Sequence, residues 1–249
     1  MFDTHFHIID FRFPVDENQG FMPPSFPVDA YRARTHDLGV TGGCVVSGSF
    51  QGFDTGFMLD ALAKFGPTFV GVIQIPATAS DAEIRTLDAA GVRGVRFNLV
   101  RGGSASVADL DRLARRVHDL AGWHAELYAD ARDLEPIYAT LAALPAVSIA
   151  HLGLSKAGLP TLLRLAERGM KVKATGFGRV VDIDVPSALR DLAHANSDCL
   201  MFGTDLPSQR ARRPFLPSDV DLIRESLDPS LWNKVFAENA IAFYRPKAV

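Results

Sequence analysis

Short apolar stretches rich in β-branched residues recur along the chain and alternate with segments of helical periodicity. Between most of the apolar stretches lie amphipathic segments such as Ala108–Leu120, Leu134–Leu144, Leu159–Arg168 and Val185–Ala195. This alternation predicts parallel strands joined by right-handed helical crossovers. The eight apolar stretches are Phe2–Ile9, Gly42–Ser49, Thr68–Ile75, Val92–Leu99, His124–Ala129, Val147–Leu152, Met170–Thr175 and Cys199–Thr204.

Eight strand–helix units in 249 residues match the size of a closed (β/α)8 barrel of the TIM type. We therefore predict one domain over residues 1–249, with an open doubly wound sheet as the alternative. A dinucleotide-binding sheet would carry a glycine-rich loop after its first strand, whereas this strand runs into Asp10-Phe11-Arg12-Phe13-Pro14. We expect Phe11–Val28 to form a loop over the active-site mouth, and helices at Asp219–Leu227 and Leu231–Phe243 to pack outside the barrel.

Composition narrows the class of protein. Hydrophobic residues make up 47% of the chain and charged residues 22%, as in soluble globular proteins. The net charge of -3 argues against a nucleic-acid partner, and no apolar run approaches the roughly 20 residues that span a bilayer. We expect a cytoplasmic protein with no membrane partner and with Cys44 and Cys199 as buried, reduced thiols. The sequence leaves open whether it forms a homo-oligomer.

Polar residues interrupt the apolar stretches where a barrel enzyme places its chemistry, at the carboxyl ends of strands. With a period of two, Asp3, His5 and His7 share one face of the first strand. His151 lies at the end of the sixth strand and Asp205 at the end of the eighth. Because the first and eighth strands of a closed barrel are neighbours, we expect Asp205 to lie beside the histidine pair.

Three histidines and an aspartate at one barrel mouth suit two chemistries. They could ligate a divalent metal ion, or the imidazoles could polarise a carbonyl while the aspartate activates water. The alternative for each is structural, because buried histidines also occur as hydrogen-bonded core residues and aspartates as turn formers. We assign His36, His118 and His194 to the surface, and His124 to the opposite, stabilising end of the barrel.

Arginines near other strand ends provide a second signal. Guanidinium groups bind carboxylates through two parallel hydrogen bonds, so several at one mouth predict a small anionic substrate. Each could instead be a solvated surface charge, which is our main expectation for Arg210, Arg212 and Arg213. The side chains that we expect to bind substrate are Arg96, Arg101, Arg179, Tyr128 and Ser47.

Five motifs appear in an order that resembles the amidohydrolase superfamily. They match its amidohydrolase-related branch, which includes 2-pyrone-4,6-dicarboxylate lactonase and sugar-acid lactonases. The motifs are Asp3-Thr4-His5-Phe6-His7, Gly94-Val95-Arg96-Phe97-Asn98, His151-Leu152-Gly153, Lys171-Val172-Lys173-Ala174-Thr175-Gly176 and Gly203-Thr204-Asp205-Leu206-Pro207.

The resemblance implies a distorted (β/α)8 barrel that hydrolyses a carboxylated lactone. The lactone would be similar to 2-pyrone-4,6-dicarboxylate, a muconolactone or a sugar-acid lactone, as in aromatic or carbohydrate-acid catabolism. His5, His7 and His151 would surround the carbonyl oxygen, and Asp205 would be the general base. The arginines at 96, 101 and 179, together with Tyr128 and Ser47, would match positions that hold the substrate.

The sequence departs from the family pattern at two positions. Tyr128 stands where many members carry a metal-bridging lysine, which argues against a two-metal site, and Leu206 replaces a frequent aromatic residue. Our first expectation is that no cofactor is required. The alternative is one divalent ion, zinc by preference, at His5, His7, His151 and Asp205. A zinc-dependent decarboxylase of an aromatic or muconate-like acid, a lactone isomerase and a non-enzymatic carboxylate-binding barrel remain as alternative functions.

Overall fold

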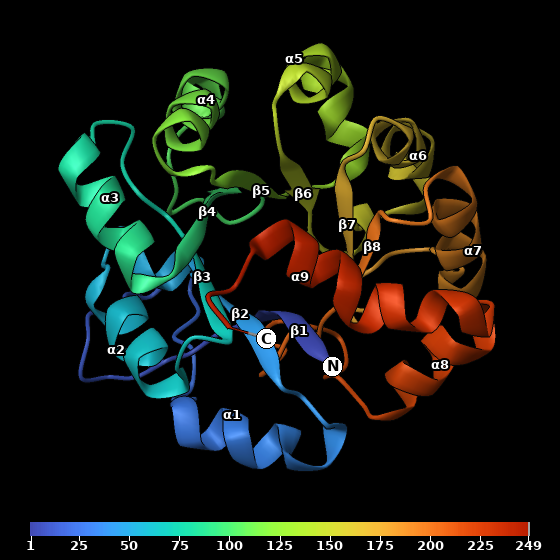
Figure 1. Ribbon diagram of the computed structural model, residues 1–249, viewed down its shortest axis with the longest axis horizontal. Helices are drawn as coiled ribbons and strands as arrows, with labels where there is room; N and C mark the ends of the chain where they lie inside the picture. The colour runs from blue at the N-terminus through green and yellow to red at the C-terminus, as the bar shows by residue number, and fades with distance from the viewer. Residues whose placement is uncertain (249) are drawn as a thin grey trace.

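The computed structural model describes residues 1–248, and its main feature is one sheet of eight parallel strands in sequential order (Figure 1). Each strand pairs with the next along the chain, as expected when helical crossovers return the chain to the same edge. The strands are β1 (Phe2–Phe6), β2 (Gly42–Val46), β3 (Phe69–Ile73), β4 (Val92–Asn98), β5 (His124–Tyr128), β6 (Val147–Ile149), β7 (Lys171–Ala174) and β8 (Leu200–Phe202).

Backbone hydrogen bonds just beyond β1 and β8 close the sheet into a barrel. The Asp205 amide donates to the His5 carbonyl at 2.7 Å, and the His7 amide donates to the Leu206 carbonyl at 2.8 Å. The predicted (β/α)8 barrel is therefore confirmed, and the open-sheet alternative is wrong. The same two bonds place Asp205 beside the histidine-bearing segment.

Helices cover the outside of the barrel, and the helices predicted at Ala108–Leu120, Leu159–Arg168 and Val185–Ala195 are confirmed within two residues. The segment predicted at Leu134–Leu144 is instead a 3-10 helix (Ala131–Ile137) followed by the short helix α5 (Tyr138–Ala143). Pro136 lies inside it and has no amide hydrogen to continue an α-helical ladder. The helices are α1 (Val28–Thr35), α2 (Gly56–Phe65), α3 (Asp81–Ala90), α4 (Leu110–Ala121), α5 (Tyr138–Ala143), α6 (Leu159–Glu167), α7 (Val185–Ala195), α8 (Ser218–Ser226) and α9 (Asn239–Tyr244).

The C-terminal segment closes the N-terminal end of the barrel. After a π-helix at Lys234–Glu238, α9 crosses in front of the strands in Figure 1. Tyr244 is fully buried and stacks on Phe2 with ring centroids 5.8 Å apart. The expectation that this segment lies outside the barrel is therefore wrong for α9, because its apolar side chains fill the open end. The interior residues packed with them are Phe2, Cys44, Val46, Val70, Val72 and Met201.

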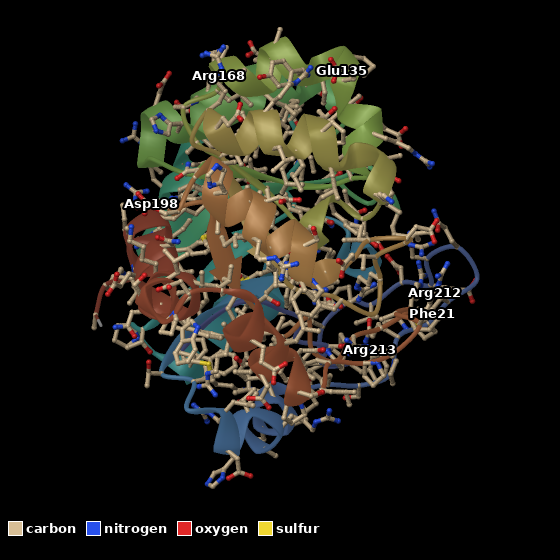
Figure 2. The ribbon with its side chains drawn as sticks, turned by 90° about the vertical axis from the view of Figure 1, so that its right-hand side faces the viewer. Phe21, Glu135, Arg168, Asp198, Arg212 and Arg213 are labelled. Atoms are coloured by element: carbon tan, nitrogen blue, oxygen red, sulfur yellow. The ribbon has the colours of Figure 1, made fainter. Side chains whose placement is uncertain are left out.

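The segment before α1 lies at the opposite end of the barrel, where we expected a loop over the mouth. The Asp16 amide donates to the Phe50 carbonyl at 2.8 Å, and Asn18 Nδ2 donates to the Arg101 carbonyl at 3.1 Å. Figure 2 shows Phe21 and Arg212 on one side of the molecule and Asp198 on the other. Within residues 1–248, no helix has the length and apolar character needed to cross a lipid bilayer.

Candidate active site

A β-bulge in β1 decides which of its side chains face the barrel interior. Three residue steps of β1, Asp3–Phe6, correspond to only two steps of β2, Gly43–Val45. The additional residue turns Asp3 away from the face that carries His5 and His7. The prediction that all three share one face is wrong, because the alternation of side chains does not continue through a bulge.

Asp3 instead joins the first and last strands from outside the barrel interior. Its carboxylate accepts hydrogen bonds from the Tyr31 hydroxyl at 3.0 Å and from the Thr204 hydroxyl and amide at 2.7 and 2.8 Å. Complete burial raises the pKa of Asp3 to about 6, against the opposing effect of these donors. The contacts hold the backbone next to Asp205 in place, so Asp3 supports the site without reaching it.

The four residues predicted to form the catalytic cluster lie together at the carboxyl ends of the strands. The His5 ring centroid is 5.2 Å from that of His7 and 4.6 Å from that of His151. Asp205 Oδ1 lies 4.0 Å from His5 Nε2 and 3.8 Å from His151 Nε2. All four side chains are almost fully buried. One carboxylate therefore faces three imidazoles across a distance that a small reacting group can bridge.

The surroundings of the three imidazoles favour their uncharged form. Burial, followed by the positive charges of nearby lysine and arginine side chains, lowers the pKa of His5, His7 and His151 well below the ordinary value. His7 Nδ1 lies 2.8 Å from the Val46 carbonyl, which can only accept, so His7 carries its proton on Nδ1. His151 Nδ1 lies 2.7 Å from the Thr175 hydroxyl, which can donate or accept.

Asp205 is held by an arginine and by its own backbone. Its φ of +60° lies in the left-handed region, which is uncommon for a residue with a side chain and is often found at active sites. Arg179 donates from Nε to Oδ2 at 2.5 Å and from Nη2 to Oδ1 at 3.1 Å. Burial raises the pKa of Asp205, and Arg179 opposes that rise. A carboxylate with a raised pKa is a stronger base than one in water.

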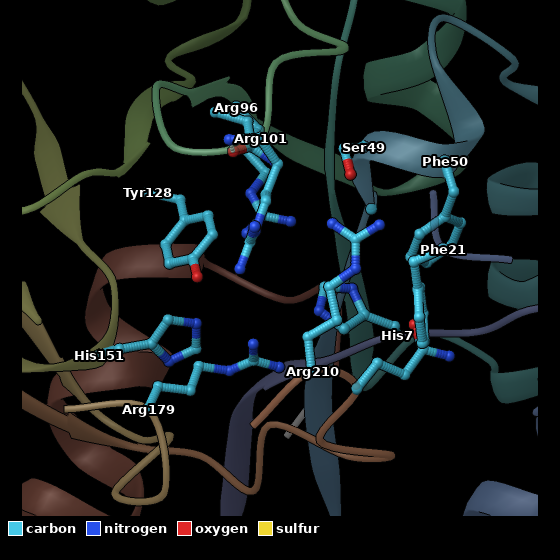
Figure 3. A pocket seen from close by; sticks show the side chains of 13 residues that line it. His7, Phe21, Ser49, Phe50, Arg96, Arg101, Tyr128, His151, Arg179 and Arg210 are labelled. Carbon is cyan, nitrogen blue, oxygen red and sulfur yellow. Dashed lines mark hydrogen bonds between the residues drawn. The ribbon is translucent and has the colours of Figure 1, made fainter. Parts of the chain in front are cut away.

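A pocket opens above this cluster. His7 and His151 line it, whereas His5 and Asp205 lie beneath its lining. Figure 3 shows Arg101, Arg179 and Arg210 around it, together with the Tyr128 hydroxyl and the His151 ring. The arginines in its lining favour an anionic ligand over an apolar one. The lining residues are His7, Phe21, Gly48, Ser49, Phe50, Arg96, Asn98, Arg101, Tyr128, His151, Arg179, Gln209 and Arg210.

Arg96 is fixed at the base of this pocket. Its Nη1 donates to the Ser47 carbonyl, and its guanidinium carbon lies 5.5 Å from the Tyr128 ring centroid. Ser47 itself does not line the pocket. Its hydroxyl is buried and has no hydrogen-bond partner among residues 1–248, and the serine in the pocket lining is Ser49. The Ser47 carbonyl holds Arg96, and contact of the Ser47 hydroxyl with a substrate stays a prediction.

Two arginines at the rim are attached to the mouth loop. Arg101 Nη1 donates to Gln19 Oε1 at 3.0 Å. Arg210 donates from Nη1 to Asn18 Oδ1 at 3.1 Å and lies over the Phe21 ring at 4.5 Å. The loop therefore orients two of the cations that face the pocket.

The arginine cluster after β8 divides between pocket and surface. Arg210, which we expected mainly at the surface, lines the pocket. Arg212 is exposed and lines an adjoining hollow. Arg213 lies outside the pocket, where its Nη2 is 2.6 Å from Asp219 Oδ1. The sequence placed the three side by side, but the turn after β8 sends them in different directions.

Two charged residues inside the barrel were not predicted to be functional. Glu126 on β5 and Lys173 on β7 are fully buried and form an ion pair. Lys173 Nζ also lies 3.3 Å from His5 Nδ1. The available signal was the position of these charges, because each stands two residues before a strand-end residue and therefore faces the interior.

Part of the catalytic cluster could hold a metal ion. His5, His7 and Asp205 each offer a ligand atom within 4.8 Å of the others. His5 Nε2 has no hydrogen-bond partner among the described residues, and two imidazoles with a carboxylate suit zinc. His151, expected as a fourth ligand, is not part of this group. The competing contact is Arg179, which bonds both oxygens of Asp205.

Comparison with known proteins gives a consistent family relationship. The model of the Amidohydrolase family matches residues 2–245. The chain is 29% identical over 264 residues to a 4-sulfomuconolactone hydrolase of Rhizobium radiobacter, covering 95% of this chain and 87% of the relative. It is 34% identical over 157 residues to a 2-pyrone-4,6-dicarboxylate hydrolase of Comamonas testosteroni, a match that covers 61% of this chain and 51% of that relative.

Solved structures share the barrel over its whole length. A crystal structure of an Agrobacterium tumefaciens protein superposes with a TM-score of 0.86 at 24% identity, covering 100% of this chain and 96% of the other. A probable 2-pyrone-4,6-dicarboxylic acid hydrolase from Acinetobacter baumannii has a TM-score of 0.81 at 21% identity, covering 98% of both chains. These similarities show the fold.

Proposed function

Because this chain belongs to the amidohydrolase family, we propose that it is a lactonase, an enzyme that opens a carboxylated lactone by attack of water on the ester carbonyl. The observation that carries the proposal is the position of Asp205, which faces three neutral histidines below an arginine-lined pocket. Two relatives named as hydrolases of cyclic esters, one for 4-sulfomuconolactone and one for 2-pyrone-4,6-dicarboxylate, support it.

In the proposed reaction, Asp205 removes a proton from water as the water oxygen attacks the lactone carbonyl. Imidazole N–H groups stabilise the negative charge that develops on the carbonyl oxygen. The protonated Asp205 then passes its proton to the departing ring oxygen, which breaks the ester bond. Before substrate arrives, the two hydrogen bonds from Arg179 keep Asp205 ionised and therefore ready to act as a base.

The pocket charge supports a small anionic substrate. Arg96, Arg101 and Arg210 face the same space as the Tyr128 hydroxyl, while Asp205 is already neutralised by Arg179. Guanidinium groups can bind a carboxylate or a sulfonate through paired hydrogen bonds. We propose a lactone with one or two acid groups, as in the breakdown of aromatic or sugar acids, and no requirement for a nucleic-acid or membrane partner.

We propose that the reaction requires no metal. Arg179 bonds both oxygens of Asp205, which supports this choice because a cation would compete with that ion pair. If an ion binds, His5, His7 and Asp205 are the residues that would hold it, and it would supply Lewis-acid polarisation of the carbonyl.

A lactone isomerase is the second candidate. The chain is 28% identical over 135 residues to a D-galactarolactone isomerase of Agrobacterium fabrum, covering 53% of this chain and 46% of that relative. Isomerisation needs the same polarised carbonyl, but a hydroxyl of the substrate replaces water as the attacking group. The pocket would serve both reactions.

A panel of lactones with mass analysis tests the proposal. The purified protein is incubated with 2-pyrone-4,6-dicarboxylate, muconolactone, 4-sulfomuconolactone and D-galactarolactone. We expect at least one product heavier by one water. A product of unchanged mass and new retention time would identify an isomerase, and loss of carbon dioxide would identify a decarboxylase. Either result, or no turnover across the panel, would overturn the proposed hydrolysis.

A further inference from the structure

The buried ammonium group of Lys173 has three acceptors around it. Its Nζ donates to the Thr4 carbonyl at 2.7 Å, pairs with the Glu126 carboxylate and lies 3.3 Å from His5 Nδ1. An ammonium group has three N–H donors and no acceptor. The three neighbours therefore account for all of its hydrogen-bonding capacity.

These contacts determine the side of the His5 ring that carries the proton. Nδ1 must accept from the ammonium group, so a neutral His5 carries its hydrogen on Nε2. The nearest carboxylate oxygen, Glu126 Oε1, lies 3.6 Å from Nδ1, which is longer than a hydrogen bond. We propose that Lys173 is a positioning residue that holds His5 in the tautomer with hydrogen on Nε2, directed toward Asp205 and the reacting carbonyl.

The neighbouring histidine has the opposite tautomer. His7 donates from Nδ1 to the Val46 carbonyl, so its Nε2 is an acceptor. The two imidazoles are almost perpendicular, with an interplanar angle of 88°. His5 therefore offers a donor for the carbonyl oxygen, whereas His7 offers an acceptor for a water or hydroxyl hydrogen. The two uncharged rings therefore interact with different groups, His5 with the carbonyl oxygen and His7 with the attacking water or hydroxyl.

The carboxylate of Glu126 stabilises the buried ammonium group of Lys173 by neutralising its charge. Lys173, Glu126 and His5 are each fully buried, and an unpaired ammonium at this depth would be strongly destabilising. Glu126 also lies 3.7 Å from Arg96 Nε, which links the pair to the arginine at the base of the pocket. The pair is thus an internal support for both His5 and Arg96.

The catalytic part of this inference rests on the proposed function, but the tautomer can be measured without substrate. Heteronuclear NMR of protein with isotope-labelled histidine distinguishes a hydrogen on Nδ1 from one on Nε2. We expect His5, assigned by the loss of its signals in His5→Gln, to carry hydrogen on Nε2 and His7 to carry it on Nδ1. A His5 ring protonated on Nδ1 in the wild type would overturn the inference.

Lys173→Met removes the donor to Nδ1. We expect mixed tautomers at His5 and a fall in kcat of about 10- to 100-fold with little change in KM, because one donor to the developing oxyanion is partly lost. Lys171→Met is the matched control. Lys171 lies on the same strand but is half-buried and donates to the Asp198 carbonyl, so its loss should leave His5 unchanged.

A second variant covers the case in which Lys173→Met leaves Glu126 unpaired and unfolds the protein. Lys173→Met with Glu126→Gln removes both charges and should fold while still losing the tautomer preference. If His5 keeps hydrogen on Nε2 in the folded double variant, Lys173 is not the positioning residue. If the tautomers behave as expected but the wild type opens no lactone, the proposed function fails while the inference stands.

Discussion

The two ends of the barrel each contain buried histidines in very different surroundings. At the mouth, His5 lies beside Asp205 and beneath an open pocket. At the closed end, His124 packs between the rings of Phe243 and Tyr244, with centroids 4.5 and 5.2 Å away. A Cβ at Gly94 would overlap its ring, so no space is left for a ligand.

His5 and His124 cannot be told apart by their burial or by ring nitrogens that lack a hydrogen-bond partner. His5 Nε2 and His124 Nε2 both lack a hydrogen-bond partner among residues 1–248, and burial lowers the pKa of both. The difference lies in what surrounds each ring: Asp205 and a pocket lie beside His5, whereas aromatic side chains pack against His124. The role of a buried histidine in such a barrel therefore follows from its place on the strand: the carboxyl end indicates chemistry and the amino end indicates stability.

The strongest test of the mouth is Asp205→Asn. The amide keeps the shape of the side chain but cannot accept a proton from water, so we expect kcat to fall by roughly 10³-fold. Steady-state kinetics on the lactone identified by the panel give the value, and circular dichroism checks the fold. Activity near that of the wild type would remove Asp205 from the role of base.

The same substitution at the two ends compares them directly. His5→Gln should lower kcat by about 10²-fold through the loss of a positioned donor to the oxyanion. His124→Gln should change thermal stability and leave kcat as in the wild type, because His124 touches neither the pocket nor Asp205. Equal losses of activity in the two variants would contradict the distinction between the ends.

Charge at the rim should affect binding more than chemistry. Arg101→Gln should raise KM about tenfold with little change in kcat, since a hydrogen bond to a charged group is typically worth about 1.5–3 kcal/mol. Arg213→Gln is its control, because Arg213 pairs with Asp219 outside the pocket. An unchanged KM in Arg101→Gln would mean that the substrate does not contact this arginine.

The closed end should show its own dependence on pH. Burial lowers the pKa of His124 to about 3, so below pH 6.5 the unfolded chain takes up a proton that the folded chain does not. This group should therefore lower the free energy of unfolding by about 2 kcal/mol between pH 6.5 and pH 5. Denaturant unfolding of the wild type and His124→Gln measures the difference, and parallel pH profiles would contradict it.

Much of the fold could be predicted because strands of a parallel sheet are buried on both faces and therefore appear in the sequence as short, continuous apolar stretches. Each of the eight apolar stretches contains one strand, and β1 and β8 follow from closure of the barrel. The position of α9 could not be predicted, since an amphipathic helix can cover the side of a barrel or its end. The 3-10 helix at Ala131–Ile137 depended on a proline whose effect varies with context.

The site was predictable where it follows strand ends and unpredictable where local geometry intervenes. His5, His7, His151 and Asp205 meet because the carboxyl ends of all strands share one rim. The alternation of residues in the sequence does not reveal the β-bulge that turns Asp3 outward. Which of Ser47 and Ser49 lines the pocket depends on the path of the chain after β2. Lys173 and Glu126 can be recognised as an ion pair only once both are known to face the barrel interior.

Turnover of a carboxylated lactone in water labelled with heavy oxygen tests directly whether water that Asp205 activates attacks the carbonyl. We expect the wild type to incorporate one labelled oxygen into the new carboxylate of the product. Asp205→Asn should bind the same lactone but incorporate almost none. Turnover without label, or equal incorporation by the variant, would contradict attack by water that Asp205 activates.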